Sequence, residues 1–154
     1  MYSNILIPLD LSHKEQVLEL AQIATALAAG IPAKINLLYV DQSFVHRAGD
    51  PQFDGNLHEG HRKEALQEME DLLCDLPDNI KVMTLYRDGT AHDQILETAE
   101  RLNSDVIVMM ARKPGISSYF IGSNAERVVR HAPCSVFIVR GDESDSRLGQ
   151  TVSK

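Results

Sequence analysis

The sequence has no tryptophan, few cysteines and a shortage of positive charge. Its 154 residues include two cysteines and carry a formal net charge of −7 at pH 7. Because nucleic acid is itself a polyanion, this charge opposes long-range attraction to it, and we expect no nucleic-acid partner. Cys74 and Cys134 form no Cys-x-x-Cys pair, which disfavours a zinc or redox site and predicts two buried thiols.

Long apolar runs and targeting patterns are missing as well. No segment approaches the roughly 20 apolar residues of a membrane span, so we expect no membrane partner. The opening MYSNILIPLD lacks the basic start and the small-residue cleavage site of a signal peptide. Together these absences predict a cytoplasmic protein.

Several signatures of chemical sites are absent too. The chain has neither the Gly-x-x-x-x-Gly-Lys-Ser/Thr motif of a P-loop nor the Gly-x-Gly-x-x-Gly motif of a dinucleotide fold. It also lacks the His-x-Gly-His motif of nucleotidyl transferases and the Gly-x-Ser-x-Gly motif of serine hydrolases. His46, His58 and His61 could form a metal site, but three-residue spacing is a weak pattern, and we expect no dedicated metal site.

What is present is a regular alternation of strand and helix patterns. Five apolar runs have strand length, at residues 4–9, 34–40, 81–87, 105–111 and 134–140. Helical stripes of apolar residues separate them. The alternation predicts an α/β fold in one domain, a doubly wound five-stranded parallel sheet with helices on both faces and the strand order 3-2-1-4-5. The third run alternates more than the others and is expected near an edge.

The domain boundaries follow from the same patterns. With 44% hydrophobic residues the chain suits one compact domain, which we place at residues 1–140. Residues 141–154, GDESDSRLGQTVSK, have no periodicity and are expected to form a flexible C-terminal tail. The connection from Asp41 to about Glu59 is too long for an ordinary turn. It is either a lid or an insertion without a function.

Three residues are predicted to cap helices. Ser12 and Ser123 are each followed three residues later by glutamate, which is the capping-box pattern. Thr90 precedes the third helical stripe and fits a simpler cap.

The predicted strand order also locates a ligand site. Ligands of open α/β sheets bind at the carboxyl ends of the strands, where the strand order reverses. Here the reversal falls between the first and fourth strands, where the loops 10–13 and 112–122 meet. Free amide groups at the start of the final helix, approachable past Gly122, favour an anion. Arg112, Lys113 and the serines of this loop would strengthen that preference, although Gly115 and Ser123 can also be read as a turn residue and a helix cap.

The sequence also resembles a known protein family over most of its length. Residues 1–140 are similar to the universal stress proteins, and SYFIGSNAERVVRHAPCSVFIVR, together with ILIPLD and LLYV, carries the resemblance. Nucleotide-binding members have a Gly-x2-Gly-x9-Gly-Ser/Thr loop. Here Gly122 and Ser123 match its end, while Met109 and Arg112 occupy the positions of its first two glycines. The loop resembles the F- and G-type nucleotide-binding branch of the family.

The resemblance implies a nucleotide site and a set of ligands. ATP is the expected ligand, with Mg²⁺ bound to its phosphates, and the protein would be a nucleotide-responsive stress-response factor. Asp10 would contact the ribose, the backbone of Val40 the adenine edge, and Pro8 the pocket wall. The phosphates would lie against three residues at the start of the final helix, Gly122, Ser123 and Asn124. To these the chain's own loop adds Arg112 and Gly115, and Met109, at the position of the first glycine, completes the candidate site.

The sequence says less about catalysis and assembly than about the nucleotide site. No residue that would orient an attacking water can be identified, so the protein is at most a slow ATPase. The resemblance implies a homodimer formed through the final strand, SVFIVR, which could assemble further into a tetramer. The alternative is a dimeric interaction protein that binds no nucleotide and has a vestigial pocket.

Overall fold

The computed structural model describes residues 1–11, 13–43, 54–73, 76–111 and 122–140. The predicted alternation of strands and helices is confirmed. The elements are β1 (Asn4–Leu9), α1 (Lys14–Ala28), β2 (Ala33–Asp41), α3 (Gly55–Asp71), β3 (Ile80–Asp88), α4 (Ala91–Arg101), β4 (Val106–Met110), α5 (Ser123–His131) and β5 (Ser135–Val139).

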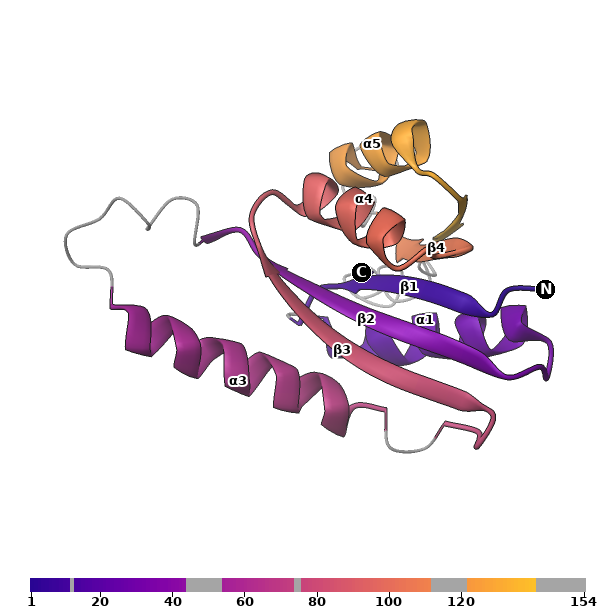
Figure 1. Ribbon diagram of the computed structural model, residues 1–154, viewed down its shortest axis with the longest axis horizontal. Coiled ribbons are helices and arrows are strands. Elements are labelled where there is room, and N and C mark those ends of the chain that lie inside the picture. The colour runs from indigo at the N-terminus through magenta and orange to yellow at the C-terminus, as the bar shows by residue number, and fades with distance from the viewer. Residues whose placement is uncertain (12, 44–53, 74–75, 112–121, 141–154) are drawn as a thin grey trace, which may run out of the picture.

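The five strands form one parallel sheet in the order β3-β2-β1-β4-β5, as predicted (Figure 1). Ile5 of β1 is paired with Ile35 of β2 on one side and with Val106 of β4 on the other. From β1 the chain adds β2 and β3 on one side and then β4 and β5 on the other. The strand order therefore reverses between β1 and β4. The carboxyl ends of these two strands are where an open α/β sheet binds its ligands.

Helices cover both faces of the sheet and divide the core in two. On one face Ile5 and Ile7 pack in a cluster with α1 and with Met69 of α3. On the other face Leu6 packs with residues of α4 and α5, among them Ile95 and Val128. Because neighbouring residues of β1 face opposite helix layers, the strand is apolar throughout, which explains its continuous apolar run.

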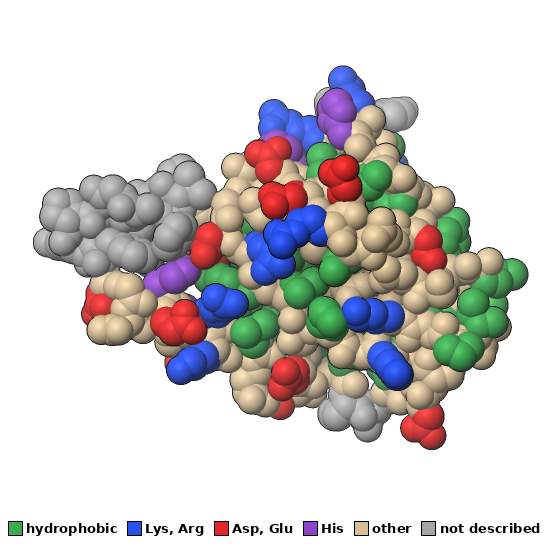
Figure 2. Space-filling model, viewed as in Figure 1, with side chains coloured by type: hydrophobic (Ala, Val, Ile, Leu, Met, Phe, Trp, Pro, Cys, Tyr) green, Lys and Arg blue, Asp and Glu red, His purple; other side chains and the backbone are tan. Residues whose placement is uncertain are grey.

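β3 is an edge strand, as its more alternating sequence predicted. Val82 and Met83 in this strand are each 38% exposed. Acidic and basic side chains are interspersed on the face that Figure 2 shows. The net negative charge therefore does not form one continuous acidic area on this face.

Two of the predicted helix caps are wrong. α5 begins at Ser123 with Gly122 as its N-cap, and no side chain caps the helix. The positive φ of Gly122, 94°, turns the chain into the helix, and its carbonyl accepts the first helical hydrogen bond, from Glu126 N–H at 2.9 Å. The Glu126 side chain pairs with Arg130 instead of reaching back to the helix start.

The N-cap of α1 is His13, not Ser12, which lies outside the described residues. Thr90 is the N-cap of α4, as predicted, although its side chain makes no capping hydrogen bond. Asp54 caps α3 through a 2.9 Å hydrogen bond from Asn56 N–H. Because α3 begins at Gly55, the connection after β2 is shorter than predicted, and residues 44–53 of the expected lid lie outside the described residues.

The predictions about the cysteines, the C-terminal tail and membrane spans can be compared with the structure in part. The Cys134 thiol is partly rather than fully buried, because it lies at the entry to the edge strand β5. Cys74 and the predicted tail, residues 141–154, are outside the described residues. No helix in the described part of the chain combines the length and the apolar character needed to cross a bilayer.

Candidate functional site

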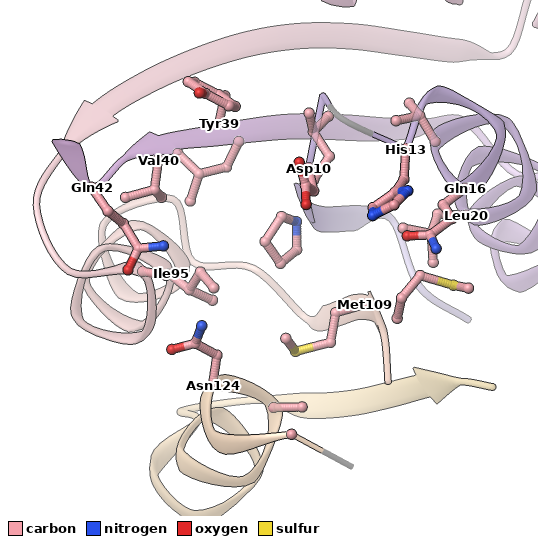
Figure 3. A pocket seen from close by; sticks show the side chains of 18 of the residues that line it. Asp10, His13, Gln16, Leu20, Tyr39, Val40, Gln42, Ile95, Met109 and Asn124 are labelled. Carbon is pink, nitrogen blue, oxygen red and sulfur yellow. The ribbon is translucent and has the colours of Figure 1, made fainter. Parts of the chain in front are cut away.

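A cavity of about 750 Å³ opens at the carboxyl ends of β1 and β4, at the predicted reversal of the sheet. Its walls come from the ends of β1, β2 and β4 and from the starts of α1, α4 and α5 (Figure 3). A volume of this size is typical of small-molecule sites.

The cavity brings together every predicted nucleotide ligand that the structure describes. These seven residues are Pro8, Asp10, Val40, Met109, Gly122, Ser123 and Asn124. Two further predicted ligands, Arg112 and Gly115, lie outside the described residues. The seven come from four segments, so their meeting depends on the fold and not on their spacing in the sequence.

The inner wall of the cavity is apolar and its rim is polar. Leu20, Ile95 and Met109 provide the apolar surface, and Met109 lies across the cavity from Asp10 in Figure 3. Asp10 is exposed, so its carboxylate can meet a ligand without the desolvation cost of a buried charge. This arrangement suits a ligand with one flat apolar part and one polar part.

The start of α5 supplies the positive potential of the site. The first amide groups of a helix have no partner within it, and the helix dipole places partial positive charge there. Ser123 and Asn124, the first residues of α5, line the cavity with their N-cap Gly122. Among the described lining residues there is no lysine or arginine, so this helix start is the main attraction for an anion in that part of the wall.

The end of β2 adds polar residues that the sequence analysis missed. Asp41, Gln42 and Ser43 line the cavity, and Gln16 joins them from α1. Figure 3 shows Gln42 and Gln16 with His13, which belongs to the predicted 10–13 loop. The rule that located Asp10 also applies to these residues, because they follow the carboxyl end of a strand next to the reversal. The resemblance drew attention to Val40 alone in this segment.

Asp41 is held in place by several hydrogen bonds. Its Oδ1 accepts from the Ser43 hydroxyl at 2.6 Å and from Ser43 N–H at 2.9 Å, and its Oδ2 accepts from the Tyr86 hydroxyl at 2.7 Å. Burial alone would raise the pKa of Asp41, but these hydrogen bonds and the nearby His58 outweigh burial and lower the pKa. Burial and the Asp41 carboxylate together raise the pKa of Tyr86.

Of the three histidines considered as a metal site, the structure describes His58 and His61, which differ in their surroundings. His58 is largely buried, with 17% of its side chain exposed, and lies beside Asp41 and Asp88. His61, three residues later on α3, is exposed, and His46 is outside the described residues. The neighbours of His58 are therefore acidic residues at strand ends.

Comparison with known proteins places the chain among relatives. A family model described as the universal stress protein family matches residues 1–140. Universal stress protein G of Escherichia coli O157:H7 is 35% identical over 146 residues, which cover 91% of this chain and all of that protein. The structure of hypothetical protein MJ0577 superposes with a TM-score of 0.76 at 25% identity and covers 93% of this chain and 99% of that one.

Two more distant structures share the fold and contain nucleotides. A universal stress protein in complex with cAMP superposes with a TM-score of 0.57 at 18% identity, over 90% of this chain and 97% of that one. One from Archaeoglobus fulgidus in complex with dAMP has a TM-score of 0.53 at 18% identity, over 89% of this chain and 97% of that one.

Proposed function

This chain belongs to the universal stress protein family, and we propose that it binds ATP, with Mg²⁺ on the phosphates, in the cavity at the carboxyl ends of β1 and β4. The observation that carries the proposal is that seven predicted ligands, from the ends of β1, β2 and β4 and the start of α5, line this cavity together. The relatives in complex with cAMP and dAMP support an adenine nucleotide as the ligand class. Occupancy would change the contacts that the protein makes in a stress response.

The adenine ring would lie beside the end of β2. Backbone groups of alternate residues in a strand point to the same side. Lys34 N–H donates to the Ser3 carbonyl at 2.8 Å, so the even-numbered residues of β2, Val40 among them, point towards β1. The pairing of β1 with β2 ends where Leu9 lies opposite Tyr39. The backbone of Val40 thus lies just past the last paired residue, where an adenine edge can form hydrogen bonds.

The phosphates would lie at the start of α5. Amide donors there bind phosphate without any cationic side chain. The positive φ of Gly122 is a conformation that residues with a Cβ rarely adopt, so glycine is needed to turn the chain into this helix. Magnesium would bind mainly to phosphate oxygens and water, which requires few protein ligands.

The proposal concerns binding and not turnover. Phosphoryl transfer also needs a residue that orients the attacking nucleophile. The sequence offers no candidate for that role, so we propose nucleotide binding alone.

A charge placed at the start of α5 tests the phosphate position. We expect Ser123→Asp to weaken the binding of Mg·ATP by about tenfold or more, measured by isothermal titration calorimetry. A tenfold loss needs only about 1.4 kcal/mol of repulsion between the new carboxylate and the phosphates. Ser123 is exposed. An aspartate in the first turn of a helix stabilises the helix by about 0.3–1 kcal/mol, so the loss cannot be attributed to unfolding.

Asn56→Asp is the matched control for this experiment. Asn56 is an exposed residue in the first turn of α3 and does not line the cavity. This variant adds the same charge at another helix start and should bind Mg·ATP as the unaltered protein does. Wild-type protein that fails to bind Mg·ATP would favour the vestigial-pocket alternative, and equal binding by Ser123→Asp would place the phosphates elsewhere.

We also propose a homodimer formed through β5. This strand is the edge of the sheet opposite β3. Its residue Phe137 is 42% exposed, and Val129 on the adjacent α5 is 50% exposed. Apolar side chains at an unpaired sheet edge are suited to pairing with a second copy.

A further inference from the structure

Three side chains from separate segments meet at the carboxyl ends of β2 and β3. Asp41 is the last residue of β2, Asp88 is the last residue of β3, and the two are paired across the strands. His58, on the first turns of α3, completes the group. One ligand atom from each residue lies within 4.8 Å of the others. The two strands run side by side to this edge of the sheet in Figure 1.

The imidazole of His58 lies between the two carboxylates. Its Nε2 is 3.2 Å from Asp88 Oδ1 and 3.3 Å from Asp88 Oδ2. Its Nδ1 is 3.9 Å from Asp41 Oδ2. The Asp88 side chain is 32% exposed, but its Oδ1 is shielded from solvent and, among the described residues, has the contact with His58 Nε2 and no hydrogen bond. A cation would satisfy this oxygen more fully than that contact does.

The surroundings orient these groups as the partners of metal ligands do. The Tyr86 hydroxyl and Ser43 hold the Asp41 carboxylate through three hydrogen bonds. The Tyr86 ring also lies edge-on to the imidazole of His58, with ring centroids 6.0 Å apart. Fixed carboxylates and imidazoles bind metal more tightly, because less side-chain freedom is lost on binding.

We propose that Asp41, His58 and Asp88 bind a divalent transition-metal ion, with Zn²⁺ preferred over Mg²⁺. Imidazole nitrogen suits zinc and its neighbours, whereas Mg²⁺ prefers oxygen ligands and water. Zinc bonds of about 2.0–2.2 Å place ligand atoms about 3.4 Å apart in a tetrahedron. The 3.2 Å spacing of His58 Nε2 and Asp88 Oδ1 is already close to this. Asp41 Oδ2 lies 3.9 Å from the other ring nitrogen, so its carboxylate would move closer to complete the set, and water would take the fourth position.

The ion would fasten the start of α3 to the sheet. From Gly55 to Glu64 every residue is exposed except His58, which is half-buried, so this part of α3 has little other anchorage. One other contact is a cation–π interaction in which Arg62 lies 5.8 Å from the centre of the Tyr86 ring. Asp41 also lines the nucleotide cavity, so the ion would fix one wall of that cavity.

Metal titration of the untagged full chain, stripped with a chelator and free of nucleotide, tests the proposal. We expect one Zn²⁺ per chain and a dissociation constant at least about tenfold lower than that for Mg²⁺. His58→Gln and Asp88→Asn should each weaken Zn²⁺ binding by about tenfold or more. Co²⁺ should give a visible absorption spectrum that His58→Gln abolishes.

A second histidine–carboxylate pair in the protein provides a matched control. His92 and Asp93 form another histidine–carboxylate pair, 3.2 Å apart, at the start of α4. The double variant His92→Gln/Asp93→Asn should retain Zn²⁺ binding. The site is disproved if the wild-type chain binds no Zn²⁺, if Mg²⁺ binds equally well, or if His58→Gln, folded by circular dichroism, binds Zn²⁺ normally. Because nucleotide is absent, none of these results depends on ATP binding.

Discussion

Cys134 shows how one side chain responds to partial burial. Burial, followed by the negative charge of Asp105, raises the pKa of its thiol above the ordinary value of 9.0. Only the thiolate is a nucleophile, so less of the reactive form is present in the folded protein. We therefore expect iodoacetamide at pH 7.5 to modify Cys134 more slowly in the folded protein than in urea, measured by mass spectrometry of its peptide. Equal rates would contradict the shift.

The same shift fixes the sign of a pH effect on stability. A thiol with a raised pKa in the folded state stays protonated there while the unfolded chain loses its proton. The thiol therefore costs no stability below pH 9.0, the ordinary value, and stability falls as the pH rises from there through the folded-state pKa. Cys134→Ser removes the group and should reduce this alkaline loss.

At the scale of single elements, α3 is held unevenly. Met69 is fully buried near its end, whereas Leu57 in its first turn is 58% exposed. Met69→Ala should lower the free energy of unfolding by about 2–5 kcal/mol, because it leaves a cavity in the core. Leu57→Ala, the matched control in the same helix, should change it by less than about 0.5 kcal/mol. Urea unfolding measures both, and a small effect of Met69→Ala would mean that α3 is not packed as described.

The elements also show what the sequence could predict. Apolar runs located all five strands, because strands covered by helices leave a nearly continuous apolar pattern, and the alternation in residues 81–87 indicated the β3 edge. The β5 run gave no such sign of the second edge, where Phe137 is 42% exposed. Helix starts were harder, since Gly122 and Ser123 both suit a cap and only the backbone conformation decides between them.

The sequence likewise predicted some residues of the candidate site and missed others. Asp10 and Gly122 followed from the strand order, because the carboxyl ends of β1 and β4 must be close together. The grouping of His58 with Asp41 and Asp88 could not be predicted. It depends on the register of β2 against β3 and on how α3 packs, and no local spacing records either of these.

At the scale of the whole molecule, the two helix layers cover the sheet unequally. Val136 and Ile138 of β5 pack in the cluster that includes α4 and α5. Phe137 points to the opposite face and is 42% exposed there, although Val139 further along the same face is buried. A stable interface usually buries about 1,600 Å² in total, and a bare strand with exposed apolar residues offers a starting surface for one.

Opposite edges of the sheet allow a matched test of the homodimer. Phe137→Asp places a charge on the β5 edge and should halve the mass measured by light scattering after size exclusion, since burying an unpaired carboxylate in an interface is costly. Val82→Asp places the same charge on the β3 edge, where Val82 is 38% exposed, and should leave the dimer intact. If Val82→Asp alone dissociates it, β3 is the interface. A wild-type chain that elutes as a monomer would refute the dimer itself.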